Sequence, residues 1–96
     1  MTVLAIVNLE TRAGQSAAFL RTMQRPLELT RANPHCSYAE LFSHHADPNR
    51  YVLIEKWDSI ALHQAHFEYL LAAGEVEDAM LTWNGMPQST HYQEIP

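Results

Sequence analysis

The sequence is poor in the residues that mark several large classes of protein. Cys36 is its only cysteine, so no disulfide can form within the chain. Lysine and arginine number 6 against 11 aspartate and glutamate, and the net charge of -5 disfavours a nucleic-acid partner. Uninterrupted apolar runs last only a few residues, far fewer than the roughly 20 that span a bilayer. We therefore expect neither nucleic acid nor a membrane as a partner.

Sequence signals for cofactors and for export are also missing. The 3 glycines are scattered and build no phosphate-binding loop, so a bound nucleotide or flavin has no support. No Gly-x-Ser-x-Gly or comparable nucleophile motif occurs. The first residues lack a basic region followed by a long apolar stretch, so we expect no signal peptide and a cytoplasmic location. Four arginines along one expected helix have acidic neighbours and are interpreted as a solvated face: Arg12, Arg21, Arg25 and Arg31.

The apolar share of the sequence is high for so short a chain. Its 96 residues suffice for one domain, which we place over residues 1–96. Hydrophobic residues make up 47% of the chain. A chain of this size buries only about 60–65% of its unfolded surface on folding. The apolar content therefore suggests that part of the surface is covered by a second subunit.

Four segments have strand character. Thr2–Glu10 and Arg50–Trp57 are apolar at both alternating positions, as expected of central strands that are covered on both sides. Ser37–His45 carries polar residues on both sides and suits a position nearer an edge. Gln88–Ile95 is expected to form the last strand.

Three segments have helical character. Gly14–Arg31 contains Pro26, which is expected to kink or break the helix at Arg25. A second helix is expected from Ile60 to about Ala73, followed by a short one over Glu75–Trp83. Asp58 or Ser59 supplies the cap of the second helix, and Gly74 ends it. The predicted buried stripe of the first helix is Ala17, Leu20, Met23, Leu27 and Thr30.

The resulting order, β-α-β-β-α-(α)-β, is that of the ferredoxin-like α+β fold with a four-stranded antiparallel sheet. In that fold the first and third strands are central, which agrees with the two strands that are apolar on both sides. Helices cover only one face of such a sheet. An apolar second face then needs a partner, so we expect a homodimer.

Two histidines fall within the apolar arc of the second helix. At about 100° per residue, His63 and His66 lie beside Ile60, Phe67 and Leu70. One interpretation makes both of them core or boundary residues with a hydrogen-bond partner. The other makes them walls of a cavity under the sheet, where a neutral imidazole serves as a base.

Glu55 shares a strand face with Tyr51, Leu53 and Trp57. A glutamate on an inward face is unfavourable unless it is paired, and His66 or His63 is a natural partner. If Glu55 faces outward instead, it is a surface acid and Trp57 is a core aromatic. Both alternatives remain open at this point.

Asn8 and the remaining histidines allow further alternatives. Asn8 stands among aliphatic residues on the second face of the first strand and is either a structural amide or a cavity ligand. His63 and His66 lie on adjacent turns, and His44-His45 or His91 would add a third metal ligand. No carboxylate or cysteine stands at a recognised metal spacing, so we expect no metal site.

Two segments resemble the antibiotic biosynthesis monooxygenase family. Glu55–Ser59, followed by His66, resembles the Glu-x-Trp-x-Ser…His signature of that family, and the local match is nearest to the quinol monooxygenase type. Asn33–Tyr38 resembles the Glu-Pro-Gly-Cys stretch before the second strand, with His35 in place of the glycine. The similarity extends along nearly the whole chain in order and spacing.

Family members are dimeric α+β barrels, and several oxidise electron-rich phenols, quinols or anthrones with O2. They use neither metal nor flavin. The resemblance therefore implies a homodimer that acts on a small aromatic substrate and O2 without a cofactor. It implies His66 as the base, Trp57 and Tyr51 as an aromatic wall, and Asn8 or His63 as a hydrogen-bonding group. The implied catalytic residues are His66, Trp57 and Asn8, and the implied substrate-binding residues are Tyr51, Glu55, His63 and Phe67.

The chain departs from two branches of that family. Leu53 stands where the polyketide-tailoring monooxygenases carry an asparagine. The haem-degrading branch has an iron-ligating histidine soon after the position of His66, and none occurs here before His91. Haem degradation is therefore not expected. The alternative to a monooxygenase is a small-molecule-binding or stress-related protein of the same fold that does not turn over a substrate.

Overall fold

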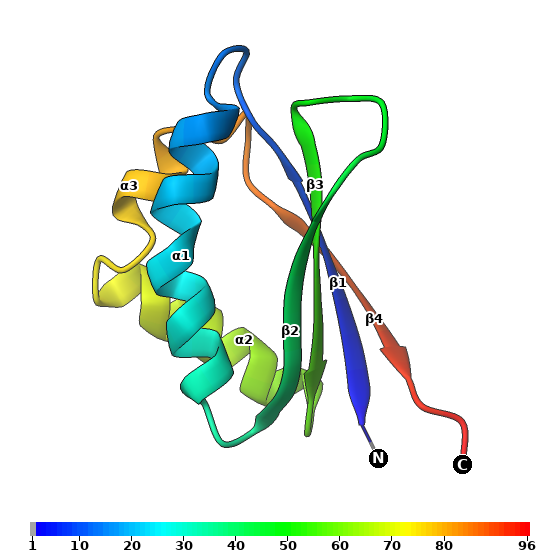
Figure 1. Ribbon diagram of the computed structural model, residues 1–96. Coiled ribbons are helices and arrows are strands. Elements are labelled where there is room, and N and C mark those ends of the chain that lie inside the picture. The colour runs from blue at the N-terminus through cyan, green and yellow to red at the C-terminus, as the bar shows by residue number, and fades with distance from the viewer. Residues whose placement is uncertain (1) are drawn as a thin grey trace.

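The computed structural model describes residues 2–96 and contains the elements that the sequence predicts, in the predicted order. Figure 1 shows how they are arranged. The strands and helices are β1 (Val3–Glu10), α1 (Ser16–Ala32), β2 (Cys36–Ser43), β3 (Arg50–Trp57), α2 (Ile60–Ala72), α3 (Glu77–Met80) and β4 (Gln88–Gln93).

The strands form one antiparallel sheet in the order β2-β3-β1-β4. This is the predicted ferredoxin-like topology, with β1 and β3 in the centre and β2 at an edge. Val7 lies opposite Leu53, and Ala5 lies between Glu55 on one side and His91 on the other. That register places side chains from three strands on the same face of the sheet.

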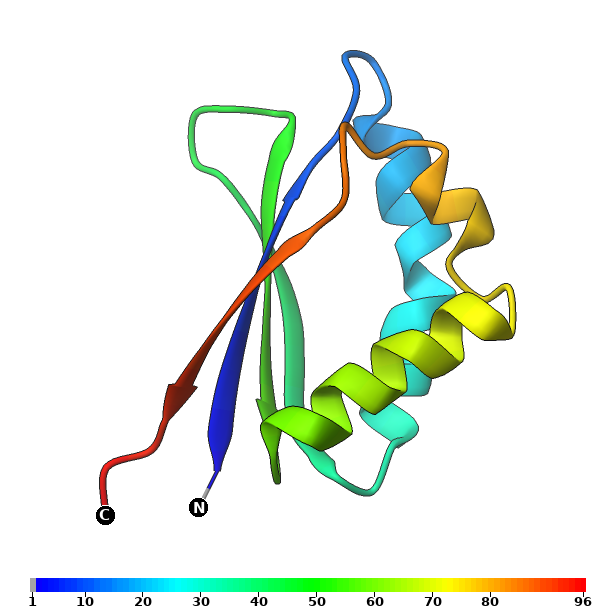
Figure 2. The same ribbon diagram turned by 180° about the vertical axis from the view of Figure 1, so that it is seen from behind.

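All three helices lie on one face of the sheet and leave the other face uncovered (Figures 1 and 2). The odd-numbered residues of β1 point toward the helices and are buried, while Leu4 and Ile6 on the other face are half-buried. The core lies between the two layers and includes Phe19 of α1 and Trp83. Both faces of β1 are apolar in sequence, but the helices cover only one of them.

Helix α1 runs continuously through Pro26, so of the predicted kink or break at Arg25 the break is wrong. The proline removes one backbone donor, but it lies on the buried face of α1, where it lines the cavity, and it does not end the helix. The buried stripe also differs from the predicted one, because Leu20 is 47% exposed and Ala17 is exposed. The residues that α1 buries are Phe19, Met23, Pro26 and Thr30.

Helix α2 begins as predicted, and the Oγ of Ser59 accepts a hydrogen bond from the backbone N–H of Leu62 at 3.1 Å. It ends before Gly74, whose φ of 73° is the left-handed conformation that glycine adopts readily. Helix α3 is shorter than predicted. The chain after it forms turns, in which Trp83 pairs with Thr11 as an isolated bridge.

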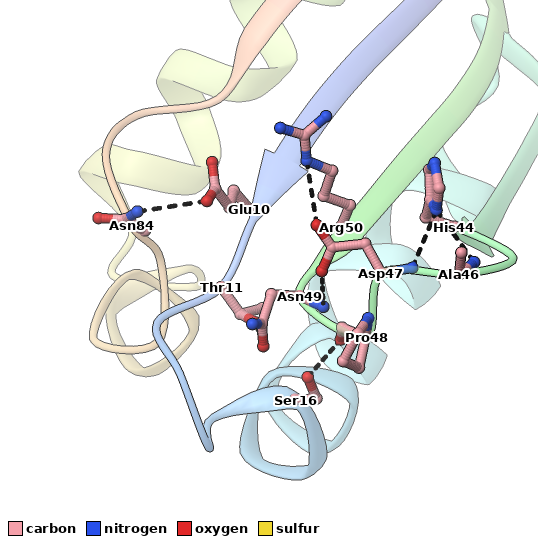
Figure 3. Close-up of polar contacts among 10 residues, drawn as sticks. All are labelled: Glu10, Thr11, Ser16, His44, Ala46, Asp47, Pro48, Asn49, Arg50 and Asn84. Carbon is pink, nitrogen blue, oxygen red and sulfur yellow. Dashed lines mark hydrogen bonds and ion pairs between the residues drawn. The ribbon is translucent and has the colours of Figure 1, made fainter.

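Polar contacts fasten the hairpin between β2 and β3 to the start of α1 (Figure 3). The Ser16 hydroxyl donates to the carbonyl of Pro48 at 2.6 Å, and the Thr11 hydroxyl donates to the Asn49 amide oxygen at 3.3 Å. Within the hairpin, Asp47 forms an ion pair with Arg50 at 3.3 Å. These contacts close one end of the space between sheet and helices.

The uncovered face of the sheet carries apolar side chains from all four strands, with Glu40 and Lys56 among them. We call this the outer face; its apolar residues are Leu4, Ile6, Tyr38, Phe42, Val52, Ile54 and Tyr92. Phe42 and Tyr92 are 44% and 56% exposed. Within residues 2–96, no helix is both long and apolar enough to cross a membrane.

Candidate functional site

A cavity of about 570 Å³ lies between the sheet and the helices. Its size falls within the range of roughly 300–1,000 Å³ that is usual for small-molecule sites. Most of the wall is apolar and is contributed by Val7, Leu9, Met23, Pro26, Leu27, Leu53, Phe67, Leu70, Val76, Trp83 and Pro87. The polar residues of the wall are Thr30, Glu55, His63, Gln64, His66, Glu68, Ser89 and His91.

Glu55 faces inward from the centre of β3 and is only 3% exposed. The indole N–H of Trp57, on the same face of the strand, donates to Glu55 Oε1 at 2.6 Å. Burial raises the pKa of the Glu55 carboxyl, and the hydrogen bond from Trp57 opposes that shift. Of the two sequence interpretations, the inward one is confirmed.

His63 projects from α2 between Glu55 and β4. Its Nδ1 is hydrogen-bonded to Nε2 of His91 at 2.8 Å, and its Nε2 lies 3.7 Å from Glu55 Oε1. The pKa of His63 is lowered to about 4, first because burial disfavours the imidazolium and then because His91 and His66 are close. His63 is therefore neutral at pH 7.

His66 is held by residues at the C-terminal end of α1. Its Nε2 lies 2.9 Å from Thr30 Oγ1, and its Nδ1 lies 3.3 Å from the amide nitrogen of Asn33. Thr30 gives its hydroxyl proton to the Pro26 carbonyl at 2.9 Å, so the Nε2–H of His66 must be the donor to Thr30. The Asn33 amide then donates to Nδ1. Both ring nitrogens of His66 are engaged, and burial lowers its pKa.

The predicted site residues divide into two groups in space. Glu55, His63, His66 and Phe67 all line the cavity. Trp57 is 1% exposed and lies behind the two histidines, with its ring centroid 5.7 Å from that of His63 and 5.1 Å from that of His66. It supports the wall and is not among the lining residues.

Tyr51 and Asn8 lie away from the cavity. Tyr51 packs against Phe19, with ring centroids 4.5 Å apart, and does not line the cavity. Asn8 is exposed and borders a separate hollow with Arg50 and Gln88. These two side chains therefore do not join His66 around one cavity, contrary to what was expected. Asn8 follows Leu4 and Ile6 onto the outer face, and Tyr51 packs against Phe19.

Sequence reasoning missed four residues that shape the cavity: Thr30, Asn33, Trp83 and His91. Asn33 fixes His66, while its own oxygen accepts the backbone N–H of His35 at 2.9 Å. The sequence suggests a role for His91 only as a possible metal ligand. A period of two along β4 places His91 on the inner face, but no local signal shows that α2 reaches it. Across residues 2–96, no group of three or more side chains is arranged to hold a metal ion.

Comparisons with known proteins agree with the fold and the motif. The sequence profile described as antibiotic biosynthesis monooxygenase matches residues 2–69. A search of curated protein sequences gave no match. A protein of Bordetella bronchiseptica with that same family description has a TM-score of 0.84 at 19% identity, covering 99% of this chain and 98% of its own.

Two further solved structures share the architecture. A Nitrosomonas europaea protein of that description has a TM-score of 0.84 at 17% identity, covering 98% of this chain and 99% of its own. A conserved protein of Methanosarcina mazei has a TM-score of 0.84 at 9% identity, covering 99% of this chain and 94% of its own. At these identities the likeness establishes the fold, and the profile match establishes the family. The chain belongs to the antibiotic biosynthesis monooxygenase family, a membership that supports a monooxygenase-like function.

Proposed function

We propose that the protein is a monooxygenase that oxidises a quinol-like or polycyclic phenolic substrate with O2 and without a cofactor. The observation that carries this proposal is the cavity of about 570 Å³, in which a mostly apolar wall holds three imidazoles and two carboxylates. An aromatic substrate gains from the apolar wall, and its hydroxyl group needs the polar residues. Family membership favours this activity over other chemistry at such a site.

The reaction balances without an external reductant. A base removes the proton of the phenolic hydroxyl, and the electron-rich phenolate passes an electron to O2. Oxygen then bonds to a ring carbon that lies ortho or para to the hydroxyl and carries a hydrogen. That carbon loses its hydrogen, one oxygen atom stays on the product as a quinone carbonyl, and the other leaves as water. The substrate supplies all four electrons, so the protein has only to bind it, remove a proton and stabilise charge.

Residues in and around the family motif are placed to carry out these tasks. Phe67 and Leu53 offer apolar contact, while His63, His66 and Glu55 bring polar groups to the same space. Trp57 positions Glu55 through its indole N–H. His66 is the base that the resemblance implies, although both of its ring nitrogens already have partners.

Oxygen uptake tests the proposed activity. Candidate quinols and polycyclic phenols are added to the protein without O2, and O2 consumption is followed after its admission. We expect uptake above that of the substrate alone, with the quinone formed in equal amount. If no candidate reacts faster with the protein than without it, the proposed activity is wrong. An unchanged rate in His66→Ala for every active substrate would remove His66 as the base.

A second candidate function is small-molecule binding without turnover. Leu53, which lines the cavity, favours it, because the polyketide-tailoring branch has an asparagine at this position. Calorimetric titration separates the two functions. A compound that binds stoichiometrically but is recovered unchanged in the presence of O2 supports binding alone.

The outer face supports the proposal that the protein is a homodimer. Its apolar side chains come from all four strands, and no helix covers them (Figures 1 and 2). Exposed apolar side chains gathered on one face commonly mark a protein interface. A second copy that packs its own outer face against this one buries both faces. We also propose that the protein is cytoplasmic.

A further inference from the structure

We propose that His91 is the residue that accepts the proton of the substrate hydroxyl, and that His63 and Glu55 position it by fixing which of its nitrogens is unprotonated. This inference rests on the proposed function and names a catalytic residue within that same cavity. His91 lies on β4, outside residues 2–69 that match the family profile. The profile match therefore does not assign it a role.

Three side chains form a continuous row along one wall of the cavity. Oε1 of Glu55 faces Nε2 of His63 at 3.7 Å, and Nδ1 of His63 meets Nε2 of His91 at 2.8 Å. The rings of His63 and His91 meet edge to face, with centroids 5.0 Å apart. Glu55 and His63 are buried, whereas His91 is half-buried at the far end of the row.

The direction of the hydrogen bond between His63 and His91 follows from Glu55. Its Oε1 already accepts the Trp57 N–H and therefore presents lone pairs to its surroundings. An unprotonated Nε2 of His63 would place a second lone pair against that oxygen, so Nε2 carries the proton of the neutral ring. Nδ1 of His63 is then an acceptor, and Nε2–H of His91 donates to it. The proton-free nitrogen of His91 is Nδ1.

Of the three cavity imidazoles, His91 is the one whose unprotonated nitrogen accepts no hydrogen bond in the described part of the chain. In the described part of the chain, His91 makes no other side-chain hydrogen bond, so Nδ1 has no competing partner. His66 uses both nitrogens, on Thr30 and Asn33. His63 uses Nδ1 on His91 and directs Nε2 at Glu55.

The proton transfer is simple to balance. The O–H bond of the substrate breaks, its proton bonds to Nδ1 of His91, and the phenolate keeps the electron pair. His91 becomes an imidazolium whose remaining N–H still donates to His63. Glu55 lies behind His63 with its acceptor oxygen directed at that ring, an arrangement like the carboxylate–histidine pairs that orient a catalytic base.

A measurement on the wild-type protein tests the positioning without any substrate. In ¹⁵N-labelled protein, a scalar coupling through the hydrogen bond should connect Nε2 of His91 with Nδ1 of His63. We expect the shared proton to be bonded to His91 Nε2 and the second proton of the pair to His63 Nε2. A shared proton on His63 Nδ1 overturns the proposal, because Nδ1 of His91 would then be protonated.

Kinetics test the catalytic role on any substrate that the wild type oxidises. We expect His91→Ala to lower kcat by about 10²–10⁴-fold, the usual contribution of a general base. Added imidazole should restore part of that loss, which would not happen if His91 were only structural. The matched control is His45→Ala in the exposed hairpin, with an unchanged rate. An unaltered kcat in His91→Ala overturns the proposal. If the wild type oxidises nothing, the proposed function fails, and the spectroscopic result still decides the positioning.

Discussion

At the scale of single residues, the buried histidines depend on partners that are distant in the sequence. His66 reaches back to Thr30 and Asn33 on the preceding helix and turn, and His63 reaches forward to His91. Each contact satisfies a polar nitrogen that burial would otherwise leave without water. The fold therefore holds neutral imidazoles in an apolar wall, a state in which they bind protons more weakly than in water.

His63 should make the folded protein sensitive to moderate acid. Its pKa is about 4 in the folded state against an ordinary 6.5, so between these pH values the unfolded chain binds a proton that the folded one does not. The free energy of unfolding therefore falls as the pH is lowered from 6.5 to 4, by on the order of 3 kcal/mol. Urea unfolding at several pH values measures this fall, and His63→Gln should show a smaller one. Parallel curves for the two proteins would contradict the prediction.

Thr30→Val should destabilise the protein through His66. The substitution keeps the shape but removes the oxygen that accepts the His66 Nε2–H, leaving that buried donor unpaired. We expect a loss of about 1–3 kcal/mol in the free energy of unfolding, measured by urea titration. Thr22→Val is the matched control, because the Thr22 hydroxyl bonds only to backbone carbonyls of its own helix. If both variants lose the same free energy of unfolding, the contact between Thr30 and His66 does not stabilise the protein.

At the scale of elements, local sequence patterns predict type and order well and predict the buried face of a helix less well. The alternation in β3 correctly groups Tyr51, Glu55 and Trp57. In α1, a stripe centred on Leu20 and Leu27 is as apolar as one centred on Phe19 and Met23, and the second is buried. The choice between them depends on which residues meet the sheet.

Ser59→Ala tests the start of α2, the element that carries His63 and His66. The Ser59 hydroxyl accepts the backbone N–H of Leu62, a donor that has no partner within the helix. We expect a loss of about 1 kcal/mol in the free energy of unfolding. Ser37→Ala on the exposed side of β2 should leave stability within about 0.5 kcal/mol of the wild type. A loss at Ser37 equal to that at Ser59 would show that the cap is not the cause.

At the scale of the whole molecule, the layered arrangement gives the two faces of the sheet different tasks. The inner face and the helices enclose the cavity. The helices lie on the other side of the sheet from the outer face (Figure 2). The predicted and the observed topology agree because strands that are apolar on both sides must be central. The proposed dimer follows from this division, since the helices of one chain cannot cover both faces.

Ile54→Lys tests the dimer directly. Ile54 lies opposite Ile6 near the middle of the outer face, so a buried charge there should prevent association. We expect the wild type to sediment as a dimer at micromolar concentration and the variant to sediment as a monomer. Leu20→Lys is the control, because Leu20 is 47% exposed on the helical side of the molecule and should leave the dimer intact. A monomeric wild type would refute the dimer.

The sequence by itself determined the order of elements, the central strands, the inward arc of His63 and His66, and the family motif that ends at His66. These depend on period and spacing, which are local. The tertiary structure decided which face of β1 the helices cover, because both faces are apolar, and this choice moved Asn8 away from the cavity. It also decided that His63 meets His91, a contact across 28 positions that depends on how α2 crosses the sheet toward β4.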